Sequence, residues 1–170
     1  MASGKPDGQT VMNKVLLLSP EKCIGCRTCE IVCSFSKIRA FNPRISRVSV
    51  FSFEEMAISV PMMCMQCEEP YCMKVCPTFA ITRTKEGVVA FDEKKCIGCK
   101  LCISACPLGN ISFSHVEGKI AKCDLCGGEP KCAEFCPSGA IEFKEPVPSA
   151  IERKKAIAEK FKELFGEGNE

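Results

Sequence analysis

The sequence lacks the features that would place it in a membrane, outside the cell or on a nucleic acid. No apolar run approaches the ~20 residues of a membrane-spanning helix. The start of the chain offers only the short apolar run 15–18, too short for a secretory signal, and no twin-arginine signal is present. With 23 basic and 21 acidic side chains the net charge is +2, which argues against nucleic acid or an anionic membrane surface as a partner. We therefore expect a cytoplasmic protein without a membrane anchor of its own.

The chain also lacks the residue patterns of an enzyme active site. It has no nucleophile beside a base, no G-x-G-x-x-G loop for a phosphate and no constellation of carboxylates. Its one histidine, His115, falls in an expected hairpin away from any cysteine, so we expect it at the surface. These absences predict that the chain itself transforms no substrate.

No cysteine lies outside four short packets, which together hold all 16 cysteines of the 170 residues. A content of about 9% is in the range of disulfide scaffolds. Disulfide frameworks, however, scatter their cysteines along the chain, whereas here each C-x2-C is followed closely by two more. The packets are Cys23, Cys26, Cys29 and Cys33; Cys64, Cys67, Cys72 and Cys76; Cys96, Cys99, Cys102 and Cys106; and Cys123, Cys126, Cys132 and Cys136.

The spacing within the packets favours iron–sulfur clusters over zinc. The third packet is the full bacterial ferredoxin run C-x2-C-x2-C-x3-C-P, and the first departs from it only at Ser34, which replaces the proline. Packets two and four widen the middle gap but keep the x3-C-P ending. Zinc sites usually combine two short knuckles a dozen or more residues apart. Sixteen thiols therefore predict four complete [4Fe–4S] clusters, and each fourth cysteine is expected to ligate a neighbouring cluster.

A repeat of thirty residues separates the last cysteines of packets two, three and four. Short strands are expected to begin at Ile81, Ile111 and Ile141, each five residues after such a cysteine. Glycine-bearing turns at 84–87 and 115–118 predict hairpins, and alternation over 47–53 predicts another strand. Aromatic side chains near the packets are expected to shield the clusters from water; they are Tyr71, Phe79, Phe113, Phe135 and Phe143.

Two tight and two widened packets, with K-C-D-L-C at 122–126 opening the fourth, resemble a known family. The pattern is similar to the four-cluster electron-transfer subunits of molybdopterin and tungstopterin oxidoreductases. Such subunits serve formate dehydrogenases, dimethyl sulfoxide reductases, aldehyde oxidoreductases, hydrogenases and carbon monoxide dehydrogenases. The resemblance covers residues 20–145 and implies an α+β fold of two nested bacterial-ferredoxin-like units with short hairpins. The outer unit would comprise 20–46 plus 117–147, and the inner, inserted unit 47–116.

The same resemblance implies a ligand set for each cluster. The outer unit would use Cys23, Cys26, Cys29 and Cys136 for one cluster, and Cys123, Cys126, Cys132 and Cys33 for the other. The inner unit would use Cys64, Cys67, Cys72 and Cys106, and Cys96, Cys99, Cys102 and Cys76. Spacing alone leaves a sequential alternative open, in which packet one exchanges with two and packet three with four.

Two segments lie outside the repeat. Residues 1–19 are expected to form a loose start and a first strand. Residues 148–170 are expected to contain an amphipathic helix, because Ser149 and Glu152 form a capping box ahead of apolar residues at helical spacing. That helix would either pack on its own domain or dock on a larger subunit.

The family resemblance implies an electron-transfer subunit that is not itself an enzyme. It would relay electrons between a larger catalytic redox subunit and a second redox enzyme or carrier, such as a ferredoxin or a flavin subunit. The compact form favours a tungsten or molybdenum enzyme that oxidises aldehydes or formate. One alternative is a free-standing polyferredoxin, although a net charge of +2 speaks against the acidic surface that helps free carriers dock. Another is the ferredoxin-like subunit of a hydrogenase or carbon monoxide dehydrogenase.

Overall fold

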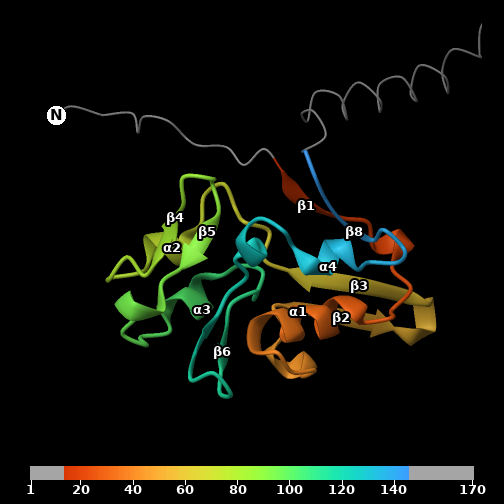
Figure 1. Cartoon of the computed structure of the whole chain (residues 1–170), viewed down its shortest axis with the longest axis horizontal. Coiled ribbons are helices and arrows are strands. Elements are labelled where there is room, and N and C mark those ends of the chain that lie inside the picture. The colour runs from red at the N-terminus through yellow and green to blue at the C-terminus, as the bar shows by residue number, and fades with distance from the viewer. Residues whose placement is uncertain (1–13, 146–170) are drawn as a thin grey trace, which may run out of the picture.

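The computed structural model describes residues 14–145, so the expected helix within 148–170 and most of segment 1–19 lie outside the described residues. The described chain is a mixture of short helices and short strands (Figure 1). The strands are β1 (Val15–Leu18), β2 (Val48–Phe53), β3 (Ile58–Met63), β4 (Ile81–Arg83), β5 (Val89–Phe91), β6 (Ser112–Ser114), β7 (Lys119–Ala121) and β8 (Ile141–Lys144). The α-helices are α1 (Thr28–Ile38), α2 (Tyr71–Lys74), α3 (Leu101–Ala105) and α4 (Lys131–Glu134). None of the described helices has the length and apolar character needed to cross a membrane.

The described strands pair in twos, as four antiparallel ribbons. The predicted hairpins are confirmed: β4 pairs with β5, and β6 pairs with β7. The predicted strand at 47–53 is present as β2 and pairs with β3, a partner that the sequence did not suggest. At one position the prediction was off by a residue, because β6 begins at Ser112 while Ile111 is buried just before it.

The fourth ribbon joins the two ends of the described chain. The expected first strand is β1, and it pairs with β8, with Val15 opposite Lys144 and Leu18 opposite Ile141. Figure 1 shows these two strands side by side. Because β8 follows packet four and β1 precedes packet one, this ribbon brings those two packets to the same part of the molecule.

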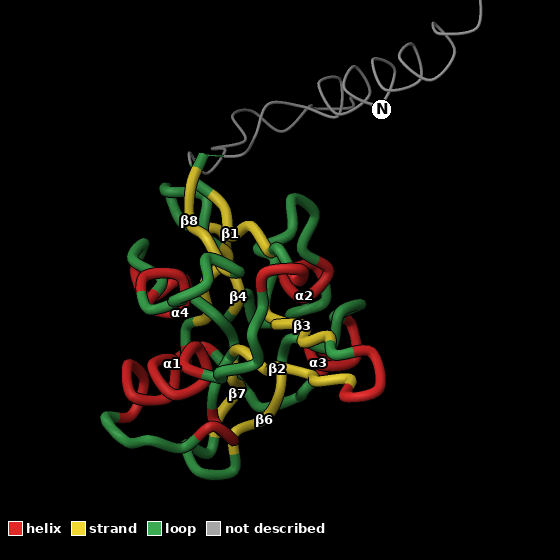
Figure 2. The backbone as a smooth tube through the Cα atoms, turned by 90° about the vertical axis from the view of Figure 1, so that its right-hand side faces the viewer, coloured by secondary structure: helices red, strands yellow, loops and turns green. Residues whose placement is uncertain are grey.

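The helices pack in two pairs that match the packets. Helix α1, from packet one, contacts α4 of packet four, while α2 of packet two contacts α3 of packet three. In Figure 1 the second pair lies at the left with β4 and β5, and the first pair lies at the right with β2 and β3. The tube in Figure 2 shows the same separation from the side, with α1 near α4 and α2 near α3.

Helix α1 is longer than its counterparts because of one residue. Pro107 directly follows Cys106 at the end of α3, and a proline at that position cannot continue a helix. Packet one has Ser34 there instead, so α1 continues to Ile38. The Ser34 hydroxyl is fully buried, donates to the Ile31 carbonyl at 2.8 Å and accepts from the Asn42 N–H at 3.2 Å.

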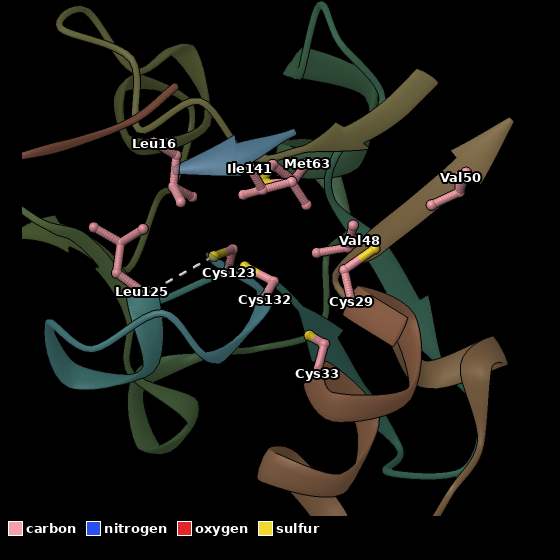
Figure 3. Packing of buried hydrophobic residues seen from close by; sticks show 10 residues of the cluster. All are labelled: Leu16, Cys29, Cys33, Val48, Val50, Met63, Cys123, Leu125, Cys132 and Ile141. Atoms are coloured by element: carbon pink, nitrogen blue, oxygen red, sulfur yellow. Dashed lines mark hydrogen bonds between the residues drawn. The ribbon is translucent and has the colours of Figure 1, made fainter. Parts of the chain in front are cut away.

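Two hydrophobic cores hold the ribbons and helices together, and cysteines form part of both. The larger core joins β1, β2, β3, β8 and α1, and Figure 3 shows its buried residues with four cysteine sulfurs among them. The smaller core centres on Ile81, Val89, Ile111 and Ile120 around Cys102. Burial of apolar side chains is the main force that stabilises such small cores. In both cores, the space around the thiols interrupts the packing of these side chains.

Candidate metal centres

Four cysteines surround a cavity between packet one and the end of packet four. This set, named site A, consists of Cys23, Cys26, Cys29 and Cys136. The cavity encloses an empty space of about 300 Å³, part of it continuous with solvent, and is otherwise lined mainly by apolar residues such as Val50 and Ile141. Three of the thiols come from one packet, and the fourth comes from a packet more than a hundred residues away.

Packets two and three build two further cavities by the same rule. Site C lies in a space of about 410 Å³ and consists of Cys64, Cys67, Cys72 and Cys106. Site D lies in a space of about 310 Å³ and consists of Cys76, Cys96, Cys99 and Cys102. In each site three thiols come from one packet and the fourth from the other, so these two packets exchange their last cysteines.

The remaining four cysteines gather where α1 meets α4. Site B consists of Cys33, Cys123, Cys126 and Cys132. Three of them, Cys33, Cys123 and Cys132, are buried in the larger core and lie close together in Figure 3. The charges of Cys123, Cys33 and Cys126 all reach Cys132 and, after burial itself, are the main causes that raise its pKa.

The four sites follow one another in the order A, B, C, D. The packing of the cysteines shows each step. Cys29 of site A lies in the same core as Cys132 of site B, Cys64 of site C packs against that core, and Cys72 of site C packs against the core that holds Cys102 of site D. The two end sites each hold an exposed thiol, Cys26 at site A and Cys99 at site D, whereas every thiol of sites B and C is at least partly buried.

Backbone N–H groups point at the thiols from the loops that follow them. Arg47 donates to the Cys33 Sγ at 3.2 Å, Ala80 to the Cys76 Sγ at 3.2 Å and Asn110 to the Cys106 Sγ at 3.3 Å. In packets three and four, Gly98 and Leu125 donate to the first cysteine, Cys96 or Cys123, at 3.4 Å in both cases. Figure 3 marks the bond from Leu125. Hydrogen bonds of this kind stabilise charge on sulfur and tune the reduction potential of an iron–sulfur centre.

Individual thiols, even within site A, differ in how readily they ionise without a metal. Burial, followed by the Glu30 carboxylate, raises the pKa of Cys29 to about 12, and burial raises the pKa of Cys123 to about 12. Burial alone would raise the pKa of Cys136. Hydrogen bonds from the Ile141 N–H, the Ser138 hydroxyl and other donors outweigh burial, so the pKa of Cys136 is lowered. Metal ligation requires the deprotonated thiolate, so binding at site A must remove a proton from a thiol that holds it firmly.

The thiol groupings fit a multinuclear cluster better than a single ion. Tetrahedral zinc holds its sulfurs at about 2.3 Å, which places neighbouring sulfurs only about 4 Å apart. Within residues 14–145 no three His, Cys, Asp or Glu side chains are grouped closely enough to hold one metal ion. Four cysteines instead line each of three cavities, with thiols as the shared donor chemistry, and four-thiolate ligation of this kind suits a [4Fe–4S] cluster.

Sequence reasoning missed two buried polar residues between sites B and C. The Gln66 amide donates to the Cys123 carbonyl at 2.9 Å and accepts from the Val89 N–H at 2.8 Å. The Lys122 ammonium is buried, lines the cavity of site C and donates to the carbonyls of the same two residues. No local signal in the sequence marks Lys122, because Lys131 also directly precedes a buried cysteine, Cys132, yet 34% of its side chain is exposed.

The predictions for the aromatic and histidine side chains met different outcomes. His115 is exposed, as expected, and contacts the edge of Phe113 at a centroid distance of 5.1 Å. Tyr71 lines the cavity of site C, although more than half of its surface is exposed, and Phe113 and Phe143 pack against the two cores. For Phe79 and Phe135 the shielding expectation was wrong, because each exposes more than half of its surface and neither lines the cavity of site A, C or D.

Comparison with known proteins gives a consistent family. Two family models, each described as a 4Fe-4S dicluster domain, match residues 22–80 and 56–146. The chain is 42% identical over 122 residues to the polyferredoxin-like subunit of an aliphatic sulfonate oxidoreductase from Pyrococcus furiosus, covering 71% of this chain and 70% of that protein. It is 32% identical over 146 residues to one of the chains of anaerobic dimethyl sulfoxide reductase from Escherichia coli, covering 74% and 70%. It is 34% identical over 155 residues to the electron transport protein HydN of Escherichia coli, covering 76% and 87%.

Among solved structures, one polypeptide of the active site complex BamBC of benzoyl coenzyme A reductase shares 26% identity with this one, with a TM-score of 0.47 over 89% of this chain and 91% of that chain. The fold, the cysteine sites and the sequence relatives together define a ferredoxin-like iron–sulfur protein of the electron-transfer kind. The protein belongs to the 4Fe-4S dicluster family, as a ferredoxin-like electron-transfer subunit of the type found in oxidoreductases.

Proposed function

We propose that this chain carries four [4Fe–4S] clusters, one at each of sites A to D, and transfers electrons within an oxidoreductase complex. One observation carries the proposal: each of three cavities is lined by four cysteines, three from one packet and the fourth from another. That is the ligand pattern of two-cluster ferredoxins. When bound, the clusters supply one-electron chemistry that no side chain of this protein offers.

The ligand sets follow the nested scheme in this proposal. Site A joins packet one to the last cysteine of packet four, and sites C and D exchange cysteines between packets two and three. The packing of α1 on α4 and of α2 on α3 supports this scheme, as does the ribbon of β1 and β8. The outer unit then comprises 20–46 plus 117–147 and the inner unit 47–116.

The protein itself contributes position, insulation and hydrogen bonds. Apolar residues such as Val50 and Ile141 wall off site A, while Ile81 and Ile120 do so at site D. Backbone N–H groups directed at the sulfurs favour the charged thiolates. The exposed thiols at the two end sites, Cys26 and Cys99, support entry of electrons at one end and exit at the other.

The partner in this proposal is a larger catalytic redox subunit. The relatives from Pyrococcus furiosus and Escherichia coli are named as parts of an aliphatic sulfonate oxidoreductase and of a dimethyl sulfoxide reductase. A tungsten or molybdenum enzyme that oxidises aldehydes or formate is the partner we propose. A ferredoxin or a flavin subunit would serve as the second redox partner.

Anaerobic purification from the native cell tests this function. The protein should contain about 16 iron atoms and equally many acid-labile sulfides, from four clusters of four irons each. It should also elute with a larger subunit on gel filtration. Zinc without labile sulfide would overturn the cluster assignment, and recovery as a monomer alone would replace the subunit by a free polyferredoxin.

A further inference from the structure

A buried lysine lies at the point where the two halves of the chain meet. Lys122 follows β7 and exposes 5% of its surface. Its ammonium donates to the carbonyl of Val89 in the inner half and to the carbonyl of Cys123 in the outer half, the second at 3.1 Å. It also lies 3.7 Å from the Cys64 Sγ. One cationic group therefore touches both site B, through Cys123, and site C, through Cys64.

The charge of Lys122 has no carboxylate to balance it among the described residues. Within residues 14–145, no ion pair within 4.0 Å involves Lys122, although nine other pairs occur. Its partners are two neutral carbonyls and a thiol. Burying an unpaired charge costs free energy, so a lysine held here needs a compensating negative charge, and loaded clusters at sites B and C would supply it.

The neighbours of Lys122 show that anchoring alone does not require a cation. Gln66 joins the same two segments, because it accepts from the Val89 N–H and donates to the Cys123 carbonyl. The neutral Gln66 amide thus already connects the inner and outer halves, and the distinctive property of Lys122 is its charge.

We propose that Lys122 sets the reduction potentials of the two central clusters, at sites B and C. This inference rests on the proposed function, since it presupposes clusters at those sites. Reduction adds one electron to a cluster and forms no bond. A fixed positive charge nearby stabilises the added electron, so both central clusters become easier to reduce. Two unit charges about 10 Å apart at an effective dielectric of about 20 shift a one-electron equilibrium by about tenfold.

The functional consequence concerns the crossing between the two ferredoxin-like units. Sites A and D lie at the ends, while B and C adjoin Lys122. Because the lysine raises the reduction potentials of the clusters at sites B and C, electron transfer into the junction between the two units does not become the energetically unfavourable step. The end sites, which Lys122 does not contact, are free to match their own partners.

Redox titration of the loaded protein, followed by electron paramagnetic resonance, tests the role of Lys122. We compare wild type with Lys122→Met, Lys122→Gln and Lys122→Arg, and use Lys119→Met as the control, because Lys119 is on β7 but pairs with Glu93 at the surface. In Lys122→Met and Lys122→Gln, two of the four midpoint potentials should fall by about 59 mV, which corresponds to an about tenfold change in the equilibrium constant for reduction. Lys122→Arg and Lys119→Met should leave all four close to wild type.

Several results would overturn the inference. Unchanged midpoints in Lys122→Gln, or equal shifts of all four, would show that the charge does not act on the central sites. If Lys122→Met fails to load, Lys122→Gln carries the same test, since its amide can still donate to a carbonyl. Failure of both to load iron, with Lys122→Arg loading fully, would assign Lys122 to anchoring instead. A wild-type protein without four clusters would refute the proposed function, a result distinct from each of these.

Discussion

The buried ion pair between Arg47 and Glu117 offers a sharp test of how the two halves are held together. The Arg47 guanidinium contacts the Glu117 carboxylate at 2.7 Å, and the two side chains expose 5% and 9% of their surface. Glu117 belongs to the turn between β6 and β7, while Arg47 precedes β2 and donates its backbone N–H to the Cys33 Sγ of site B. The pair therefore connects the turn of the β6–β7 hairpin to the segment that hydrogen-bonds to Cys33 of site B.

Glu117→Ala should destabilise the protein strongly. The substitution leaves the Arg47 charge buried, with its Nε already lacking a partner among the described residues. Removing one member of a buried pair costs about 3–5 kcal/mol, because the other charge stays uncompensated. If the whole loss lowered the barrier to unfolding, unfolding would be roughly 10² to 10⁴-fold faster. The acceleration is smaller because part of the loss slows folding instead. We expect at least about a tenfold acceleration.

The assay is the rate at which the visible cluster absorption is lost in a fixed concentration of urea, under anaerobic conditions. A rate is the appropriate measure because unfolding with loss of a cofactor is irreversible. Glu69→Ala is the matched control: its carboxylate also lies 2.7 Å from an ammonium, that of Lys74, but both side chains are largely exposed. Exposed pairs contribute little, so that rate should change less than about twofold. Equal rates for Glu117→Ala and Glu69→Ala would refute the reasoning.

Two further predictions concern the cysteine loops. Gly25→Ala should lower stability more than Gly98→Ala. Both glycines have a positive φ, +67° and +71°, a conformation that costs a residue with a side chain about 1–2 kcal/mol. A Cβ at Gly25 would in addition lie 2.8 Å from the Ser59 Oγ, whereas a Cβ at Gly98 would have nothing within 4 Å. The reverse order in urea unfolding would contradict the packing at site A. In the iron-free chain at pH 8, iodoacetamide should label Cys136, whose pKa is lowered, before Cys29, whose pKa of about 12 keeps its thiol protonated until the pH rises towards that value. Equal labelling of both, read by mass spectrometry, would show that the site does not exist without iron.

The sequence predicted the repeating parts of the fold well. Period-two alternation and glycine turns located β4 with β5 and β6 with β7, because hairpin partners are neighbours along the chain. Strand β3 was missed, since Pro61 lies within it and interrupts the pattern of a strand. The pairing of β1 with β8 joins the two ends of the described chain, and no local signal encodes such a partner.

The candidate sites show the same division between local and long-range information. Spacing alone identified every cysteine of interest, yet it could not say which packet would supply the fourth thiol. The structure brings Cys136 to packet one and Cys106 to packet two, an arrangement that depends on how whole helices pack. Lys122 and Gln66 escaped notice because a lysine or a glutamine in a sequence is ordinarily a surface residue, and their burial depends on the meeting of the two halves.

The central claim is the crossed ligand set of four clusters, and the iron content of two double variants tests it most directly. Two alanines in one cluster should remove that cluster alone, whereas two in different clusters should remove both. If Cys136 serves site A, Cys23→Ala with Cys136→Ala should retain about 12 irons, and Cys96→Ala with Cys136→Ala about 8, of about 16 in the wild type. The opposite result, about 8 irons in the first and about 12 in the second, would contradict the account and establish the sequential pairing of packets.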